Sequence, residues 1–251
     1  MFKINNLSGA NVHKNNFIEW MGQQIKTLPD SKHRMKKHEI YLEMRSRICL
    51  LDYRPGTRLN ERELASEFGI SRTPMRDVLR KLEHNGLISS QHGHGTIVTS
   101  FDLKSMRDIY LVRMSLMDAL GDSTPTITDA GTVSELRYLE SQCETLLKDN
   151  DKREFAKVLM HLHKILHGLT SNHVLKEIND TLFYQSVRFW FQLLDRVDMR
   201  IQVEDLKDEI LMLRRSLDIG DVKLTASIHK AYLRMVVSRL DSIQKEGGIL
   251  F

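Results

Sequence analysis

The sequence contains little cysteine, proline or glycine. Its 251 residues include 2 Cys, 4 Pro and 13 Gly. The two cysteines, Cys49 and Cys143, are too few for a disulfide framework and lack metal-ligand spacing. We expect both to be small buried residues of a cytoplasmic protein. The scarcity of Pro and Gly excludes a turn-rich all-β chain and favours long uninterrupted helices.

Long apolar runs are missing as well. No stretch approaches the ~18 consecutive apolar residues that a membrane-spanning helix needs, so no membrane association is expected. Hydrophobic residues make up 41% of the chain and charged residues 28%. These fractions are ordinary for a globular protein and exclude a disordered or fibrous one. A chain of this length normally folds into more than one domain.

Positive charge is concentrated in one part of the chain. Residues 31–100 contain 13 Lys and Arg against 8 Asp and Glu, a net charge of +5, whereas residues 101–251 contain 21 against 23, a net charge of −2. A basic segment joined to a mildly acidic one is typical of a polyanion-binding module on a neutral domain. The charge alone is equally compatible with a small domain that carries a few excess surface cations.

The basic segment begins with two stretches of helical apolar spacing. The first covers 36–53 and is expected to end before Pro55 and Gly56, because proline cannot continue a helix. The second begins at Asn60–Glu63, which resembles a capping box. It is expected to stop at Gly69, as helices often do at glycine.

A third helix and a hairpin follow at once. The helix begins near Ser71 with Pro74 in its first turn, where the missing N–H costs nothing. Its apolar residues recur at i, i+3, i+4 and i+7 and form one stripe: Met75, Val78, Leu79 and Leu82. Two β-like runs, 87–90 and 96–99, flank a glycine-containing loop and predict a hairpin.

Together these elements predict a winged helix-turn-helix. The apolar stripe fixes the second helix of the pair on the first and leaves Ser71–Arg76 free to enter a major groove. Arginine pairs bidentately with guanine, Ser and Thr reach phosphates or bases, and a helix N-terminus attracts phosphate. The small His-Gly tip of the hairpin can follow the backbone into the minor groove. The alternative is a helical subdomain with solvated arginines, but the turn, the arginines, the wing and the local charge together favour DNA binding.

From residue 102 onward the pattern is helical almost throughout. The candidate helices are 102–120, 133–149, 151–169, 173–196, 203–219 and 221–245. An all-helical domain of this size can dimerise and can enclose a small ligand. The aromatic run 183–191 is expected in the core or in a dimer interface.

The predicted fold is therefore mainly α. An N-terminal winged helix-turn-helix, with three helices and a β-hairpin wing, precedes an all-α helical bundle that acts as an effector domain. The predicted boundaries are an N-terminal extension at 1–35, the DNA-binding domain at 36–100, and the ligand-binding and dimerisation domain at 101–251.

Four stretches of the basic segment resemble the GntR family of bacterial transcriptional regulators. They are Tyr53-Arg-Pro-Gly-Thr-Arg-Leu-Asn-Glu-Arg-Glu-Leu-Ala65, Gly69-Ile-Ser-Arg-Thr-Pro-Met-Arg-Asp-Val-Leu-Arg-Lys-Leu-Glu83, Gly86-Leu-Ile and Gln91-His-Gly. The resemblance implies a homodimer that binds a short interrupted palindrome in double-stranded DNA. It places DNA contacts on Arg62, Ser71, Arg72, Thr73, Arg76, His92 and Gly93. Arg62 would contact phosphate or a base, Arg72 and Arg76 the major groove, and His92 the minor groove.

The C-terminal segment is similar to the FCD effector-binding domain of the FadR subfamily. The matching motifs are Asp108-Ile-Tyr-Leu-Val-Arg113, His163-Lys-Ile-Leu-His-Gly-Leu-Thr-Ser-Asn172 and Ile219-Gly-Asp221. Many FCD domains hold a divalent metal with one Asp and three His. Here only His163 is retained, because the other positions hold Leu159, Ile210 and Tyr232. A lone imidazole does not hold a metal tightly against water, so no metal cofactor is expected.

A second interpretation of the histidines is kept open. His163 and His167 lie four residues apart on one helix face, and with His161 or His229 they could coordinate zinc, as in a metal-dependent enzyme. Clustered histidines are more often surface residues or hydrogen-bonded core residues. The sequence shows no Ser/His/Asp order, no phosphate-binding glycine loop and no paired carboxylates, so we do not expect an enzyme.

A pocket without metal needs another anchor for its ligand. Arg113, if it faces inward as the resemblance implies, offers a planar fork to a carboxylate or phosphate, and His163 and Tyr232 could add hydrogen bonds. An interhelical ion pair is an equally good interpretation of Arg113. The sequence thus predicts a ligand-responsive regulator, a repressor, that takes a small organic acid or related effector. The alternative is a constitutive DNA-binding dimer with a degenerate, ligandless C-terminal domain.

Overall fold

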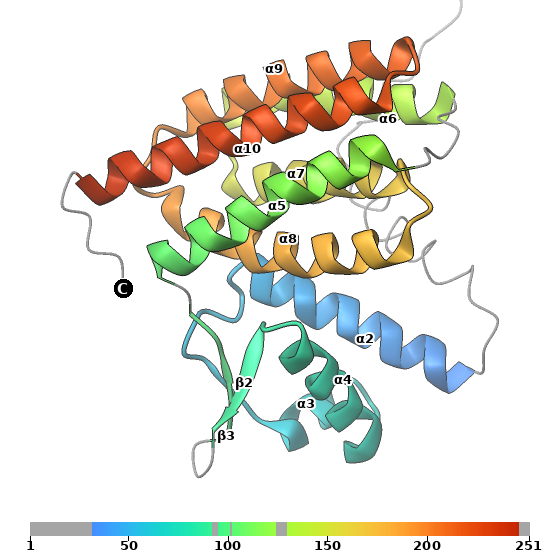
Figure 1. The fold of residues 1–251 in the computed structure, drawn as a ribbon. Coiled ribbons are helices and arrows are strands. Elements are labelled where there is room, and N and C mark those ends of the chain that lie inside the picture. The colour runs from blue at the N-terminus through green and yellow to red at the C-terminus, as the bar shows by residue number, and fades with distance from the viewer. Residues whose placement is uncertain (1–31, 92–94, 101, 124–129, 246–251) are drawn as a thin grey trace, which may run out of the picture.

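The computed structural model describes residues 32–91, 95–100, 102–123 and 130–245. A small N-terminal unit lies below a larger helical one (Figure 1). The predictions made for residues 1–31, and for His92 and Gly93 at the wing tip, lie outside the described residues. Within the described ranges, no helix is both long enough and apolar enough to cross a membrane.

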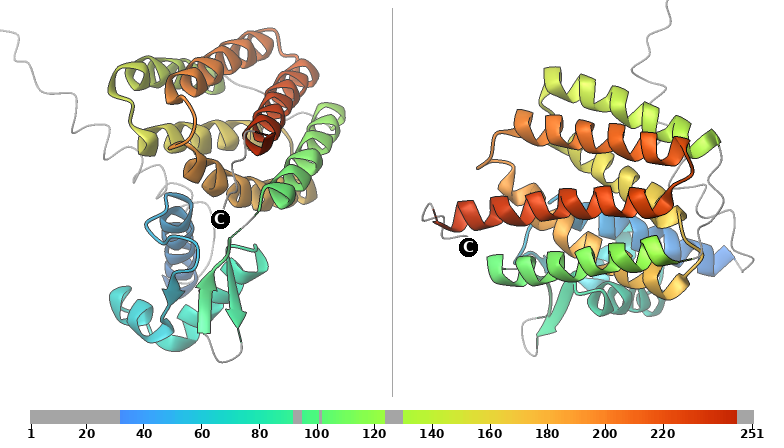
Figure 2. Two further views of the ribbon diagram at one scale, coloured as in Figure 1. Left: turned by 90° about the vertical axis from the view of Figure 1, so that its left-hand side faces the viewer. Right: turned by 45° about the horizontal axis from the view of Figure 1, so that its top comes forward.

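The N-terminal unit is a winged helix-turn-helix with one strand more than predicted. Its helices are α2 (Lys32–Cys49), α3 (Glu61–Glu67) and α4 (Arg72–His84). Its strands are β1 (Arg58–Leu59), β2 (Ile88–Gln91) and β3 (Gly95–Val98), in the antiparallel order β1-β3-β2. The strands β2 and β3 extend away from the helical unit (Figures 1 and 2). Strand β1 has two residues, too few to show an alternating pattern in the sequence.

Local sequence signals place α3 and α4 as predicted. The Asn60 side chain caps α3 by accepting hydrogen bonds from the backbone N–H of Arg62 and Glu63. The four apolar residues of the α4 stripe are all buried: Met75, Val78, Leu79 and Leu82. Gly86 ends α4 with a φ of 68°, a conformation that glycine adopts without strain.

The first helix differs from its prediction at both ends. Helix α2 begins at Lys32, so the predicted boundary between 35 and 36 falls inside a helix. It ends at Cys49 rather than at residue 53, because Leu51 has a φ of 60° and breaks the helix before Pro55. The helix does end before Pro55, as predicted, but the turn begins several residues earlier than expected.

Six helices form the C-terminal unit, and their ends lie within four residues of the predicted ones. They are α5 (Leu103–Asp122), α6 (Ala130–Asp149), α7 (Lys152–Gly168), α8 (His173–Leu193), α9 (Met199–Asp218) and α10 (Val222–Lys245). Helix α10 packs chiefly against α5 and α9, and α6 packs against α9. Helix α8 is the layer nearest to the N-terminal unit and contacts α2 (Figures 1 and 2).

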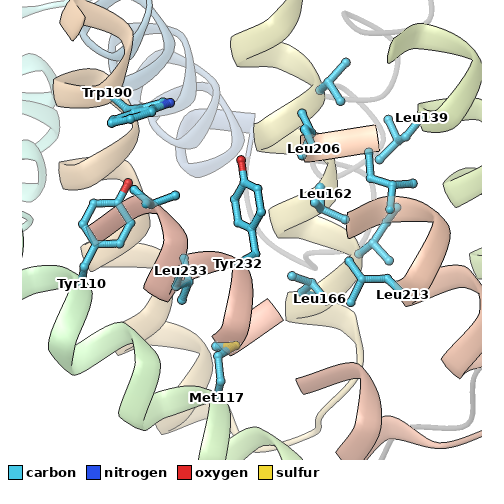
Figure 3. Packing of buried hydrophobic residues seen from close by; sticks show 14 of the residues in the cluster. Tyr110, Met117, Leu139, Leu162, Leu166, Trp190, Leu206, Leu213, Tyr232 and Leu233 are labelled. Atoms are coloured by element: carbon cyan, nitrogen blue, oxygen red, sulfur yellow. The ribbon is translucent and has the colours of Figure 1, made fainter. Parts of the chain in front are cut away.

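The core of the helical unit combines leucines with aromatic rings. Figure 3 shows Leu162, Leu166, Leu206 and Leu213 on one side and Tyr110 and Trp190 on the other, with Tyr232 between them. Both cysteines are free and buried, as predicted. Burial raises the pKa of each thiol to about 12, so neither thiol ionises near neutral pH.

Candidate nucleic-acid interface and effector cavity

The amino end of α4 is exposed to solvent. Ser71 is the N-cap residue and its side chain makes no capping hydrogen bond. Ser71, Arg72, Thr73 and Arg76 are all exposed, while Met75 anchors the opposite face in the core. The residues predicted to read DNA are therefore on the accessible face of the helix. Arg62 is exposed on the neighbouring α3.

Arg76 is held by a carboxylate in the free protein. Its Nε and Nη2 atoms donate to the two oxygens of Glu61, over 3.1 and 3.0 Å. The Arg76 side chain is 57% exposed, so solvent screens this ion pair. Arg76 has to leave Glu61 before it can donate both hydrogen bonds to a base. This contact could not be predicted from the sequence, because the two residues lie on different helices.

Removing Glu61 is therefore expected to strengthen DNA binding. In the Glu61→Ala variant Arg76 is free, and one negative charge near the phosphates is gone. We expect affinity for duplex DNA to rise on the order of threefold to tenfold at low salt, measured by fluorescence anisotropy. Asp108→Ala, which removes an exposed carboxylate from α5, is the control and leaves the affinity unchanged. A weaker complex with Glu61→Ala would contradict this and would show that Glu61 positions Arg76 for DNA.

A further cation lies beside the wing. Arg58 is exposed on β1, opposite Ile97 of β3. Its side chain passes close to Gly95, the first residue of β3. Arg58 was not singled out in the sequence, because the strand that carries it to the wing was not predicted.

The three residues predicted to bind a ligand line one cavity. Arg113 from α5, His163 from α7 and Tyr232 from α10 surround it together with Glu209 and His229. The cavity has a volume of about 40 Å³. The resemblance thus placed Arg113 correctly: it faces inward and is 4% exposed.

Arg113 is buried among aromatic rings and a few polar side chains. Its Nη1 atom donates to Ser186 Oγ over 3.0 Å. Its guanidinium carbon lies 5.4 and 5.3 Å from the ring centroids of Tyr110 and Phe183. Burial lowers the pKa of Arg113, although the nearby Glu209 acts to raise it. The Nε atom is buried and has no hydrogen-bond partner among the described residues.

Glu209 and His229 form a buried pair in the wall of the same cavity. His229 Nδ1 and Glu209 Oε1 are 2.5 Å apart. The other carboxylate oxygen, Oε2, is buried without a hydrogen-bond partner among the described residues. Burial raises the pKa of Glu209, and His229 and Arg113 act against that rise. Sequence reasoning missed Glu209, because a single carboxylate in a helix normally faces solvent; it named His229 only as a candidate metal ligand.

A chain of contacts runs from His163 to the N-terminal unit. The His163 ring stacks on Phe183 with centroids 3.8 Å apart, and its Nε2 lies 3.2 Å from Asp180 Oδ1. The other oxygen of Asp180 accepts a hydrogen bond from Arg45 Nη1 of α2, over 2.9 Å. Burial acts to raise the pKa of Asp180, but the hydrogen bond from His163 and the charge of Arg45 lower it to about 2.

His163 should make folding pH-dependent. Burial lowers its pKa to about 4, whereas histidine in an unfolded chain titrates near ~6.5. Below pH ~6.5 the unfolded state binds a proton that the folded state does not, so stability falls as the pH drops towards 4.

The test compares the wild type with His163→Gln in urea denaturation between pH 7 and pH 4.5. We expect the slope of unfolding free energy against pH to be shallower in the variant by up to about 1.4 kcal/mol per pH unit, one proton's worth. Equal slopes would show that His163 is not buried in the neutral form.

Helix α8 also makes hydrogen bonds to the DNA-binding unit through Arg188. Its Nη1 donates to the carbonyl oxygens of Leu87 and Thr99 over 3.2 and 3.0 Å. Its Nη2 donates to Gly86 O and to Thr99 Oγ1 over 3.3 and 2.6 Å. Three residues earlier on α8, Gln185 Nε2 donates to the carbonyl oxygen of Asn85, the C-cap of α4, over 2.9 Å. Burial lowers the pKa of Arg188 to about 10.

The described residues do not bring a set of metal ligands together around His163. Of the four positions that hold the metal in FCD domains, only His163 is a metal-binding residue type here, and its Nε2 already contacts Asp180. Ile210, at another of these positions, is fully buried in the core. His161 lies 3.1 Å from Glu135 instead of joining His163. In the part of the chain that the structure describes, no three His, Cys, Asp or Glu side chains are grouped to hold a metal ion.

The winged helix and the attached helical bundle with its buried cavity define a class of protein, the two-domain DNA-binding regulators. Family models agree with this on both units. Residues 36–98 match the bacterial regulatory proteins of the gntR family, and residues 108–215 match the FCD domain. The chain belongs to the GntR family, carries an FCD domain, and is a transcriptional regulator.

Named relatives are similar over part of their length. An uncharacterised HTH-type transcriptional regulator of Bacillus subtilis, YdhC, is 28% identical over 154 residues, which is 58% of this chain and 67% of that protein. The gluconate operon transcriptional repressor of Bacillus subtilis is 26% identical over 192 residues, covering 68% of this chain and 76% of the relative.

Solved structures share the fold. A GntR regulator from Rhodococcus sp. RHA1 superposes with a TM-score of 0.65 at 16% identity, covering 82% of this chain and 97% of that one. McbR/YncC of E. coli gives a TM-score of 0.66 at 16% identity with the same coverage. The mainly α fold, with its small sheet and helical C-terminal domain, is thereby confirmed.

Proposed function

We propose that this regulator is a homodimer that binds a palindromic operator, represses transcription, and releases or tightens its grip when a small organic acid enters the cavity. The observation that carries the proposal is the pairing of two features. One is the exposed amino end of α4 with Arg72 and Arg76. The other is the buried Arg113, whose Nε is unpaired in an internal cavity. The name of the gluconate operon repressor supports repression over activation.

The DNA roles are assigned by residue. Arg72 and Arg76 donate to guanine O6 and N7 in the major groove, and Ser71 and Thr73 contact phosphates or bases there. Arg62 contacts the phosphate backbone or a base. His92 and Gly93 enter the adjacent minor groove. Their support is the exposure of the α3 and α4 residues on one side of the winged helix.

The dimer follows from the palindrome. Two α4 helices read two half-sites only if the protomers are held at a fixed separation. Sedimentation equilibrium is expected to give twice the 29.2 kDa mass of the chain at micromolar concentration. If the protein were a monomer and still bound a palindrome, the helical unit would not be a dimerisation domain.

The effector acts on α8 and α2. Arg113 presents its fork to the carboxylate, and His163 and Tyr232 add hydrogen bonds. A ligand on His163 competes with Asp180, which also holds Arg45 of α2. Because α2 packs on α4, a change at His163 can favour one arrangement of the DNA-binding unit over another. We propose that this happens without a metal ion, so dialysis against EDTA leaves DNA binding and the effector response intact.

A second candidate is favoured by the size of the cavity. A water molecule needs roughly 10–15 Å³ of such space, so a volume of about 40 Å³ holds a few waters and no organic acid unless the walls move. This favours a constitutive DNA-binding dimer whose helical unit only dimerises. Arg113 Nε and Glu209 Oε2, which have no hydrogen-bond partner among the described residues, favour the ligand-responsive regulator instead.

One experiment separates the two. Small organic acids and acyl thioesters are screened for an increase in melting temperature, and each hit is tested for its effect on operator affinity. The ligand-responsive regulator shows at least one compound that does both, and Arg113→Met abolishes both effects while DNA binding without ligand persists. A screen without hits, with normal DNA binding, supports the constitutive dimer.

A further inference from the structure

Two buried polar atoms of opposite character, on residues that line the cavity, have no hydrogen-bond partner among the described residues. Arg113 Nε is a hydrogen-bond donor and Glu209 Oε2 is an acceptor. Both residues are 4% exposed and both line the cavity. Buried polar groups are normally paired, so each unpaired atom requires an explanation. A ligand that supplied only an acceptor, such as a simple carboxylate, would satisfy Arg113 and leave Glu209 as it is.

The charges of the cavity also disfavour a simple anion. Arg113 and Glu209 interact electrostatically across the site. A monoanionic acid on Arg113 would bring a second negative charge close to the Glu209 carboxylate in apolar surroundings, where repulsion is poorly screened. A ligand with a positive group beside its carboxylate avoids this cost and adds an attraction.

The rest of the wall is compatible with a small ligand that has one apolar part. Tyr110, Trp190 and Leu233 also line the cavity, and the rings of Tyr110 and Trp190 lie on the same side of the bundle (Figure 3). At about 40 Å³ the cavity takes even a compact molecule only if its walls move. The two unpaired atoms require one acceptor and one donor from the ligand, and the rest of the wall is apolar. These features together fit an acid with a hydrogen-bond donor on the carbon next to its carboxylate.

We propose that the effector is a small zwitterion of the α-amino acid type, with its carboxylate on Arg113 and its ammonium on Glu209. The inference rests on the proposed function and narrows its organic acid to one class. His229 holds the other oxygen of Glu209 and thereby fixes the direction of the free one. The carboxylate of Glu209 is the group that separates amino acids from other acids of the same size.

The test uses matched triplets that differ in one substituent. The first is L-alanine, L-lactate and propanoate; the second is L-phenylalanine, L-phenyllactate and 3-phenylpropanoate. Binding to the full-length protein is measured by isothermal titration calorimetry and by melting temperature. In at least one triplet the amino acid binds about tenfold or more tightly than the acid without a donor, because its ammonium both donates to Glu209 Oε2 and offsets its charge.

Glu209→Gln identifies the group responsible. The substitution keeps the shape and removes the charge, so the preference for the amino acid falls to about threefold or less, while the plain acid binds as well or better. Arg113→Met removes binding of all members. If Glu209→Gln does not fold, as judged by circular dichroism, the order of affinities within the triplets on the wild type still decides.

The outcomes distinguish a failure of the zwitterion proposal from a failure of the proposed function. Plain or hydroxy acids that bind as well as the amino acids, or a preference that survives Glu209→Gln, overturn the zwitterion and leave an acid-responsive regulator. No binding by any member overturns the zwitterion as well. In that case the wider acid and thioester screen decides whether the cavity takes a ligand at all.

Discussion

Replacing Arg72 and Arg76 together by alanine is expected to lower the affinity for the specific operator by about a hundredfold or more. Each bidentate arginine–guanine contact discriminates by about 1–3 kcal/mol. Both side chains are exposed at the amino end of α4, and the core stripe of the helix is untouched by the change. The melting temperature should therefore stay close to that of the wild type, apart from the loss of the screened Arg76–Glu61 pair.

The control must remove the same charge elsewhere. Arg215 and Arg234 are exposed on α9 and α10, and their double alanine variant loses two cations far from α4. Anisotropy titrations on operator and on scrambled duplex separate specific from general binding. The α4 variant loses mainly the specific component, and the control loses little of either. An equal, small loss in both variants would mean that α4 does not read the bases.

Arg188→Met is expected to destabilise the protein by about 2–4 kcal/mol and to uncouple its two units. The guanidinium donates four hydrogen bonds from α8 to Gly86, Leu87 and Thr99. Methionine has a similar length but no donor, so these buried acceptors lose charged partners. Part of the loss is offset because burying the arginine is itself costly, as its lowered pKa of about 10 indicates.

Scanning calorimetry gives the clearest result. The wild type is expected to unfold in one transition, because Arg188 and Gln185 of α8 connect the helical unit to the end of α4. In Arg188→Met the DNA-binding unit melts at a lower temperature and a second transition separates. Arg215→Met, an exposed arginine on α9, keeps one transition. A single unshifted transition in Arg188→Met would show that other contacts, such as the Arg45–Asp180 pair, hold the units together.

The DNA-binding unit was largely predictable from the sequence because its signals are local. The α4 stripe, the Asn60 cap and the glycine at position 86 each act within a few residues of themselves. The short strand β1 was missed because two residues carry no periodicity. The early end of α2 was missed because Leu51, an unremarkable residue, takes the left-handed conformation.

The cavity was only partly predictable, since it joins residues far apart in the chain. Arg113, His163 and Tyr232 followed from a family resemblance and do line one cavity. Glu209 is buried beside His229, which lies 20 residues further along the chain on the next helix. Likewise Asp180 and Arg188 lie about a hundred residues or more from their partners Arg45 and Leu87. The sequence of α8 predicted an aromatic core helix and gave no sign that it also grips the DNA-binding unit.

Selection from a random pool of duplex DNA tests the central claim most directly. The purified full-length protein is expected to enrich an inverted repeat whose half-sites are centred about ten base pairs apart or a multiple of that. The Arg72→Ala, Arg76→Ala variant enriches no sequence under the same conditions. Failure of the wild type to enrich any sequence, or enrichment of the same repeat by the variant, would contradict the account of α4 as the element that reads DNA.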